Sequence, residues 1–158
     1  MDNKEVELTL ASDVEVVLSR TVNAPRELVF DAWTNPEHLP NWMLGPPGWT
    51  MPVCERDNRA GGSHRTVWRK GDGAEMEIAG TVREFDPPSR YVATESWGPG
   101  WPETVNTITF TDSDGRTLVE VSILYPSQEA RDAALRTPMK EGMEQGFARL
   151  DDYLPTIG

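Results

Sequence analysis

The chain has 158 residues, a length that fits one domain burying about 70% of its unfolded surface. Its 26 acidic residues outnumber 15 basic ones, and the net charge of −11 disfavours nucleic acid and anionic membranes as partners. The single cysteine, Cys54, excludes an internal disulfide framework and a cysteine-based zinc site. No apolar run is long enough to span a bilayer, and the charged start at Met1–Glu7 is unlike a secretion signal, so we expect a cytoplasmic protein.

The first third of the chain predicts one strand and two short helices. Residues 1–12 are polar, and we expect them to be frayed. A valine-rich strand over 14–22 precedes a helix over 26–34 that Pro25 opens, and a further helical turn is expected over 37–42.

The middle of the chain has the pattern of an antiparallel meander. Turns rich in glycine, proline and aspartate separate segments rich in β-branched and aromatic residues. The predicted strands are 49–57, 62–70, 75–86, 89–97, 103–112 and 116–125. The links between them are too short for the crossover helices that parallel strands require, so we expect neighbouring strands to run antiparallel.

Two helices are predicted at the end of the chain. Ser127 is placed to cap a short helix over 128–136, and Thr137 is placed to cap a long one over 138–154. In the long helix, apolar residues recur at steps of three and four and therefore share one face. These residues are Met139, Met143, Phe147, Leu150 and Leu154. Such a helix needs an apolar surface to pack against.

Gly142 and Gly146 lie on or beside this apolar face, and each costs about 1 kcal/mol of helix stability relative to alanine. Either they let the helix pack closely on a sheet, which is the default for protein interiors, or they leave room for a bound molecule. On the second interpretation, Gly146→Leu abolishes ligand uptake without unfolding the domain.

Alternation along the strands assigns their faces. Met76, Ile78 and Val82 share one side of their strand, and Glu75 and Glu77 share the other. One sheet face is therefore solvated and the other faces the helix. A twisted antiparallel sheet of about seven strands curls around a long helix and leaves a cleft wherever side chains do not fill it.

Several ordered segments carry a family resemblance that spans roughly residues 14–154. They are the run from Arg20 to Glu37, Asn41-Trp42 followed by Gly45-Pro46, the run from Asp57 to Gly62, Pro87-Pro88, and the run from Met139 to Phe147. Together they resemble the proteins homologous to the activator of heat-shock-protein-90 ATPase. One departure is Trp42-Met43, where the family usually has two tryptophans.

The resemblance implies an α+β, START-like helix-grip fold, in which a curved antiparallel sheet wraps a long C-terminal helix and two short helices follow the first strand. The wider superfamily includes lipid carriers, hormone and allergen ligand-binders, and polyketide cyclases. This branch has no common catalytic signature. A chaperone partner and a role in stress response follow from the family name alone.

The sequence lacks motifs for common catalytic sites. Neither histidine lies in a metal-ligand spacing, and no phosphate loop or nucleophile elbow occurs, so we expect no metal, no cofactor and no catalytic residue. His64 shares a strand face with Thr66 and Trp68 and is interpreted as a hydrogen-bonded interior histidine, with proton transfer as the alternative. Glu55 and Glu95 either face the cleft, where desolvation raises their pKa, or face water if the register shifts by one residue.

The first hypothesis is non-enzymatic binding of a small apolar or amphipathic molecule between the sheet and the helix 138–154, by a monomer or homodimer. The predicted ligand-binding residues are His64, Trp68, Met76, Ile78, Trp97, Met143, Phe147, Glu55 and Glu95. Trp97 and Trp101 flank a glycine-rich hairpin tip. This tip either overhangs the mouth of the cleft or is a stiff exposed turn. The alternatives are a cyclase or dehydratase using His64 or Glu95 as general base, and a chaperone-activating interaction module.

Overall fold

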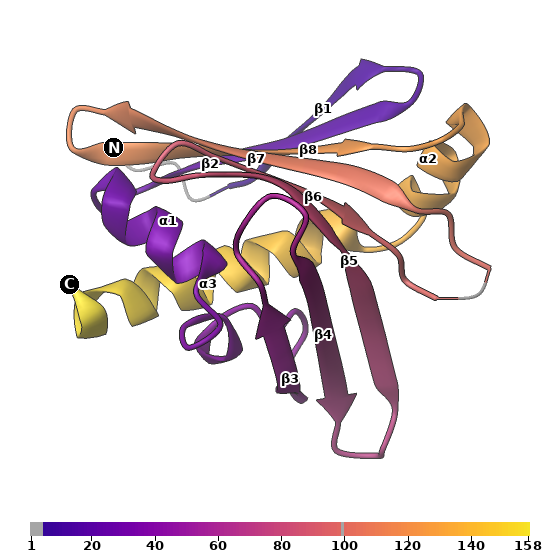
Figure 1. Ribbon diagram of the computed structural model, residues 1–158, viewed down its shortest axis with the longest axis horizontal. Coiled ribbons are helices and arrows are strands. Elements are labelled where there is room, and N and C mark those ends of the chain that lie inside the picture. The colour runs from indigo at the N-terminus through magenta and orange to yellow at the C-terminus, as the bar shows by residue number, and fades with distance from the viewer. Residues whose placement is uncertain (1–4, 99) are drawn as a thin grey trace.

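A single antiparallel sheet dominates the computed structural model, which describes residues 5–98 and 100–158 (Figure 1). Its eight strands lie in the order β1-β2-β8-β7-β6-β5-β4-β3. They are β1 (Glu7–Ser12), β2 (Glu15–Val22), β3 (Trp49–Arg56), β4 (Ser63–Lys70), β5 (Glu75–Asp86), β6 (Arg90–Glu95), β7 (Thr104–Ser113) and β8 (Arg116–Leu124). All seven predicted strands are present, and all neighbours run antiparallel as expected.

Strand β1 is the eighth strand, and it contradicts the prediction of fraying for residues 7–12, while residues 1–4 of that prediction lie outside the described residues. It pairs with β2 from Glu7↔Ser19 to Ser12↔Glu15. Apolar residues at every second position put Val6 in the core and Leu8 partly against it. The backbone carbonyl of Ser12 also accepts a hydrogen bond from Arg131 Nη1 at 2.7 Å. Pairing and these distant contacts therefore order a segment whose polar composition predicted disorder.

The short helices follow the sequence closely. Helix α1 (Arg26–Thr34) begins after Pro25, as predicted. The helical turn expected over 37–42 is a single 3₁₀ turn, η1 (Leu39–Asn41). Helix α2 (Gln128–Leu135) begins at the predicted cap, because Ser127 Oγ accepts a hydrogen bond from the Ala130 amide at 3.1 Å.

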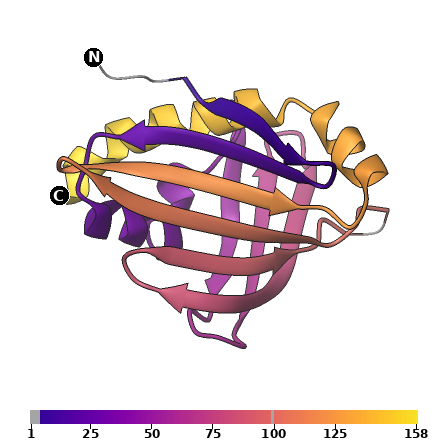
Figure 2. The ribbon, with the colours of Figure 1, turned by 90° about the horizontal axis from the view of Figure 1, so that it is seen from above.

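Helix α3 (Met139–Ile157) begins with Pro138 as its N-cap residue, so the prediction that Thr137 caps it is wrong. The Thr137 hydroxyl instead donates to the Ala134 carbonyl at 2.6 Å, which ties it to the end of α2. The apolar face of α3 is buried only at its middle and end, at Phe147, Leu150 and Leu154. Figure 2 shows α3 passing beneath the strands of the sheet.

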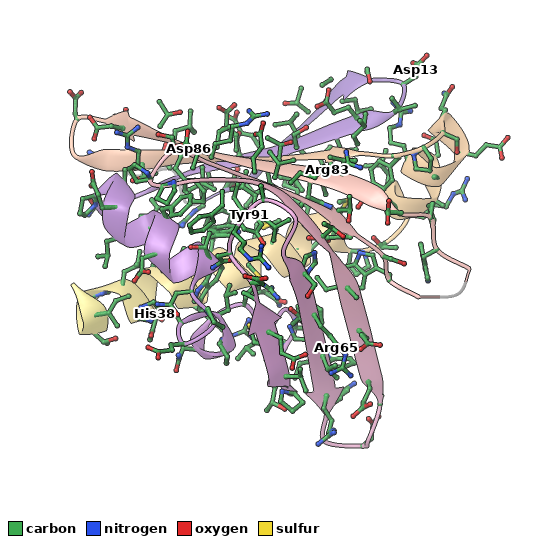
Figure 3. All side chains as sticks on the ribbon, viewed as in Figure 1. Asp13, His38, Arg65, Arg83, Asp86 and Tyr91 are labelled. Carbon is green, nitrogen blue, oxygen red and sulfur yellow. The ribbon has the colours of Figure 1, made fainter. Side chains whose placement is uncertain are left out.

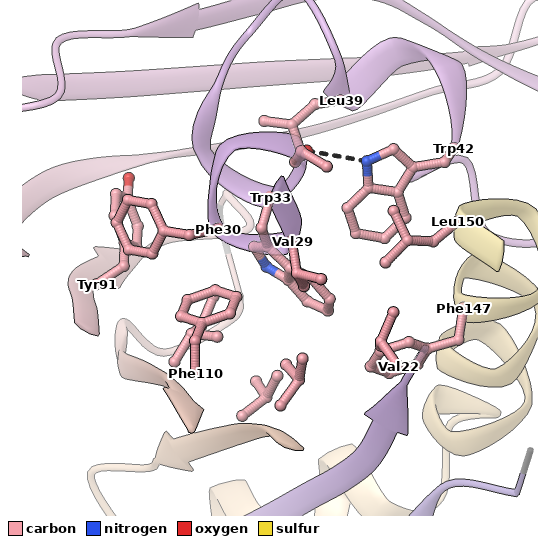
Figure 4. Close-up of a cluster of buried hydrophobic side chains, with 14 of the residues drawn as sticks. Val22, Val29, Phe30, Trp33, Leu39, Trp42, Tyr91, Phe110, Phe147 and Leu150 are labelled. Carbon is pink, nitrogen blue, oxygen red and sulfur yellow. Dashed lines mark hydrogen bonds between the residues drawn. The ribbon is translucent and has the colours of Figure 1, made fainter. Parts of the chain in front are cut away.

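Aromatic side chains fill the core between α1, the sheet and the second half of α3 (Figure 4). The Trp33 ring lies 4.8 Å from that of Trp42, 5.3 Å from Phe147 and 6.0 Å from Phe110, measured between centroids. The Trp42 indole N–H donates to the Ala32 carbonyl at 3.0 Å. Trp33 and Trp42 are therefore packing residues of the core.

The sheet bends sharply within β5. The pairing of β5 with β6 shifts register between Val82 and Glu84, and a bulge of this kind increases local twist. Strands β3 to β5 turn down beside α3 while β1, β2, β8 and β7 lie over it (Figure 1). The predicted α+β architecture with a curved sheet around a C-terminal helix is confirmed at this level, and it is consistent with a helix-grip fold.

Candidate functional site

A cavity of about 710 Å³ lies between the sheet and the first turns of α3. Its lining comes from four regions: the β3–β5 arm, the facing strands β6 to β8, helices α2 and α3, and the loops around Leu44 and Trp101. The lining residues are Leu44, Gly45, Pro46, Trp49, Trp68, Glu75, Met76, Glu77, Glu95, Trp97, Trp101, Pro102, Thr104, Asn106, Ile123, Tyr125, Ala130, Ala134, Thr137, Pro138, Met139 and Gly142. This volume lies within the range of small-molecule sites.

Strands β6 and β7 contribute one group of polar residues to the cavity wall. Glu95 pairs across these strands with Thr104, and Asn106 lies two residues further along β7. The Asn106 amide donates to the Thr104 hydroxyl at 2.8 Å. The side-chain oxygen of Asn106 and the carboxylate of Glu95 are thus two polar groups that can orient a ligand on this wall.

Burial raises the pKa of Glu95 from 4.5 to about 7, although the positive charge of Arg56 opposes the shift. Desolvation is the larger effect on the pKa, because burial removes more solvation energy from the charged carboxylate than from the neutral carboxylic acid. Among the described residues, no side chain hydrogen-bonds or ion-pairs the Glu95 carboxylate. This residue lines the cavity, and at neutral pH its carboxyl group lies close to its own titration point.

Tryptophan side chains form the mouth of the cavity. The rings of Trp68 and Trp97 stack with centroids 5.7 Å apart and planes 9° from parallel. Trp68 is held in place because its indole N–H donates to the Met43 carbonyl at 2.8 Å. Trp97, Met76 and Trp101 are 39%, 44% and 51% exposed, which is unusual for side chains of this size.

The structure brings together four of the nine predicted ligand-binding residues. Trp68, Met76, Trp97 and Glu95 all line the cavity. Trp101 lines it as well. The expectation for the hairpin tip between Trp97 and Trp101 includes residue 99, which lies outside the described residues, and it stays a prediction. Whether these residues bind a ligand stays a prediction.

His64 is buried beside the cavity and is absent from its lining. It is 5% exposed, and its Nε2–H donates to the Thr94 carbonyl at 2.7 Å across Gly80 of the intervening strand. Nδ1 is buried without a hydrogen-bond partner, and burial lowers the pKa of the ring. The interpretation as a hydrogen-bonded interior histidine agrees with this geometry.

Three other predicted residues belong to the packed interior instead of the cavity lining. Ile78 is buried in β5, Met143 packs partly against the core, and Phe147 is 1% exposed beneath Trp33. Their inward orientation was predicted correctly. Other side chains cover these residues depending on where α1 and η1 lie. The spacing of apolar residues in α3 does not indicate those positions.

The inward orientation considered for Glu55 is wrong. Glu55 is opposite Arg65 in the β3–β4 ladder, and both side chains are exposed, with Arg65 Nη1 3.7 Å from Glu55 Oε1. Figure 3 shows Arg65 on the part of β4 that projects away from the rest of the sheet. The inward residue is its neighbour Arg56, which pairs with His64. A register shift between Thr50 and Val53 in β3 makes this outcome hard to read from alternation.

The sequence prediction missed the β7–β8 wall. Along β7, the buried positions Thr104, Asn106, Ile108 and Phe110 alternate with partly exposed ones. These buried positions are apolar at Ile108 and Phe110 but polar at Thr104 and Asn106. This change is the sequence signal that the start of β7 faces a cavity. Tyr125 follows β8 and gave no such indication.

The two glycines of α3 have different surroundings. A Cβ atom at Gly142 meets nothing within 4 Å, whereas one at Gly146 lies 4.0 Å from Trp42 Cζ3. Gly142 therefore leaves open space, and Gly146 faces the core. The prediction that Gly146→Leu blocks ligand uptake needs correcting, because that substitution crowds Trp42 and the residue that faces the cavity is Gly142.

A second, smaller cavity of about 440 Å³ lies at the other end of α3. It includes Arg20 and Asp151, which form a bidentate ion pair at 3.0 and 2.6 Å. Both ionic groups already have partners, so we regard this cavity as a structural feature of the β2–α3 contact.

The described residues contain no cluster of three or more His, Cys, Asp or Glu side chains placed to hold a metal ion. No helix among them is long and apolar enough to cross a membrane.

Comparisons with known structures support the fold. A crystal structure of a protein from Rhodobacter sphaeroides is similar, with a TM-score of 0.90 and 28% identity over 98% of this chain and 100% of that one. A protein from Nitrosomonas europaea has a TM-score of 0.82 at 22% identity, covering 93% and 97% of the two chains. One from Mycobacterium smegmatis has a TM-score of 0.81 at 22% identity, covering 95% of each. The last two show the fold alone.

No curated protein matches the chain significantly. The family model described as Activator of Hsp90 ATPase homolog 1-like protein matches residues 23–155. This match covers the α1 segment, the sheet from β3 onward and nearly all of α3. The chain therefore belongs to the family of Activator of Hsp90 ATPase homolog 1-like proteins.

Proposed function

We propose that the protein binds a small apolar or amphipathic molecule without converting it, in the cavity at the start of α3. The observation that carries the proposal is the cavity of about 710 Å³, lined mainly by aromatic and aliphatic side chains together with a smaller number of polar groups. Apolar burial supplies about 25 cal/mol per Å² of binding free energy, and the polar wall selects among ligands. A cytoplasmic location remains an expectation.

Gly142→Leu tests the cavity assignment directly. The added side chain extends from a position with open space around it into the cavity. Leucine also raises helix propensity by about 0.8 kcal/mol over glycine, so the fold should be retained. We expect fluorescence titration with the neutral probe N-phenyl-1-naphthylamine to show saturable binding to the wild type and binding weakened at least about tenfold in Gly142→Leu.

Gly142→Ala is the matched control for this experiment. It gives a similar gain in helix propensity but adds only one methyl group, so probe binding should stay close to that of the wild type. Circular dichroism should show all three proteins folded. A folded Gly142→Leu variant that binds the probe as tightly as the wild type contradicts the proposed site.

One observation favours a second candidate function, an enzyme of the cyclase or dehydratase type. A carboxyl group whose pKa is about 7 in a cavity suits general acid–base catalysis at neutral pH. Glu95 is better placed for this role than His64, whose Nε2–H is engaged by Thr94. The chaperone-activator alternative rests on the family name alone.

Native mass spectrometry separates these two candidates. The protein is purified from its own host, any retained compound is identified, and the compound is returned to fresh protein. Recovery with unchanged mass supports a carrier. Conversion to a product, lost in Glu95→Ala although the compound still binds, supports an enzyme and contradicts the non-enzymatic proposal.

A further inference from the structure

The charge of the cavity lining is one-sided. It includes the three carboxylates Glu75, Glu77 and Glu95, and none of the described lining residues is a lysine, arginine or histidine. The whole chain carries a net charge of −11, which attracts cations towards the molecule. An anionic ligand would enter this cavity against both the local and the overall charge.

The three carboxylates differ in what they contact. Arg69 Nε donates to Glu75 at 2.8 Å, and Arg65 donates to Glu77 through a short hydrogen bond. These two carboxylates on β5 are therefore already neutralised by exposed arginines of β4. Glu95 has no such partner among the described residues, and it is the carboxylate on the buried wall.

Aromatic faces complete the chemical character of the cavity. Trp49, Trp68, Trp97, Trp101 and Tyr125 all contribute to the lining. Among aromatic side chains tryptophan attracts cations most strongly through the negative face of its ring, and cages of several aromatic rings are a recurring way in which proteins hold quaternary ammonium groups. A ligand with an apolar body and a positive group satisfies both the rings and the unpartnered carboxylate.

We propose that the cavity selects amphipathic cations, with the ammonium group of the ligand against the Glu95 carboxylate and its apolar body among the tryptophan rings. This inference rests on the proposed function and adds the chemical class of the ligand. A neutral amphiphile makes the same apolar contacts but leaves the carboxylate unpaired. A carboxylate-bearing amphiphile meets like charge.

Ionisation of Glu95 is coupled to this binding. The positive charge of Arg56 on β3 acts on its carboxylate, and that carboxylate acts in turn on Tyr91 on β6 and Tyr125 after β8. Glu75 and Glu77 also line the cavity. Burial raises the pKa of both tyrosines, so they stay neutral below their ordinary value of 10, and an arginine stays charged in proteins. Compared with Arg56 and the two tyrosines, Glu95 is therefore the group that changes charge near pH 7, and a permanently charged ligand should bind more tightly as the pH rises through that range.

The test compares ligands that share one apolar body. 4-Phenylbutylamine, 4-phenylbutanol and 4-phenylbutanoate are titrated by calorimetry at about pH 8, where Glu95 is mostly ionised. We expect the amine to bind at least about tenfold more tightly than the alcohol, because a hydrogen bond to a charged group contributes more than a neutral one. The carboxylate should bind most weakly.

Glu95→Gln identifies the responsible residue. It should weaken amine binding to within about twofold of alcohol binding and leave the alcohol unchanged, because only the charged interaction is lost. Glu7→Gln is the matched control, since it makes the same change at an exposed position of β1 and should preserve the preference for the amine. With 4-phenylbutyltrimethylammonium, wild-type affinity should rise between about pH 6 and about pH 8, and Glu95→Gln should show no such rise.

The outcomes separate this inference from the proposed function. If the alcohol or the carboxylate binds as tightly as the amine while N-phenyl-1-naphthylamine still distinguishes wild type from Gly142→Leu, the cationic selectivity is wrong and the cavity stands. If the amine preference persists in Glu95→Gln, another group holds the cation and the assignment to Glu95 is overturned. If neither the probe nor any of the matched ligands binds, both proposals fail.

Discussion

Gly80 shows how one residue permits a close approach between neighbouring strands beside the cavity. A Cβ atom built at this position lies 1.9 Å from the Thr94 carbonyl oxygen and 2.8 Å from His64 Nε2. The same carbonyl accepts the hydrogen bond from His64. The missing side chain therefore lets β4, β5 and β6 approach closely where the sheet turns around α3.

Gly80→Ala should destabilise the protein by about 3 kcal/mol, at the upper end for overpacking, because backbone atoms cannot move aside as a flexible side chain does. Urea unfolding measures the loss. Gly71→Ala is the control, since a Cβ atom there meets nothing within 4 Å, and it should change stability by less than about 0.5 kcal/mol. Equal urea midpoints for Gly80→Ala and Gly71→Ala would show that the close approach at Gly80 does not exclude a side chain there.

At the scale of elements, an ion pair joins strand β2 to helix α3 at the end opposite the large cavity. The Arg20 guanidinium is almost fully buried, lies 5.2 Å from the Phe147 ring centroid and forms two hydrogen bonds to Asp151. Its Nε atom is buried without a partner. Of these contacts, the Asp151 carboxylate is the one that compensates the positive charge of Arg20.

Asp151→Asn should cost about 3 kcal/mol of stability, because removing one member of a buried pair leaves the other charge uncompensated. Asp152→Asn makes the same change at an exposed position of the same helix and should cost less than about 0.5 kcal/mol. The double variant Arg20→Met, Asp151→Met should be more stable than Asp151→Asn alone, since no charge remains buried. Thermal or urea unfolding of the wild type and the three variants measures these differences in stability. If the double variant is no more stable than Asp151→Asn, the loss of stability in Asp151→Asn comes from packing and not from the unpaired charge of Arg20.

On the scale of the whole molecule, the space between sheet and helix is divided in two. Aromatic rings from α1, from Trp42 directly after η1, and from the sheet fill the region under the second half of α3 (Figure 4). The first half of α3, with Met139 and Gly142, borders the open cavity. The packed end supplies the stability of the fold. Because of that stability, the end with the cavity can tolerate Glu95, a carboxylate that is poorly solvated when ionised.

This arrangement predicts a dependence of global stability on pH. The pKa of Glu95 rises from 4.5 to about 7 on folding, so the folded state binds more protons than the unfolded state between these values. Stability from this group is therefore present at low pH and is lost as the pH rises towards about 7. The free energy of unfolding of wild type minus that of Glu95→Gln should fall across this window and level off above it.

Urea unfolding of both proteins at a series of pH values measures this difference. His64 contributes with the opposite sign, because its pKa is lowered on folding and stability is lost as the pH falls below its ordinary value of 6.5. That contribution is present in both proteins and cancels in the difference. Parallel stability curves for the two proteins would contradict the assigned environment of Glu95.

Local pattern in the sequence determined most of the elements. Turn residues and alternation located seven strands, the cap at Ser127 located α2, and the spacing of apolar residues located the buried face of α3. The ordered resemblance over residues 14–154 pointed to the family that the match over residues 23–155 then showed. These features succeed because hydrogen-bond geometry and side-chain periodicity act over a few neighbouring residues.

Tertiary structure alone decided where the interior is filled and where it is empty. Met139, Met143 and Phe147 have equivalent places in the periodicity of α3, yet Phe147 lies under Trp33 and Met139 borders the cavity. The bulge in β5 and the register shift in β3 placed Glu95 at the cavity and Glu55 in water. A strand or helix presents its face by local geometry, but the atoms that cover that face come from segments distant in the chain, so burial, cavity volume and the pKa of Glu95 are properties of the assembled fold.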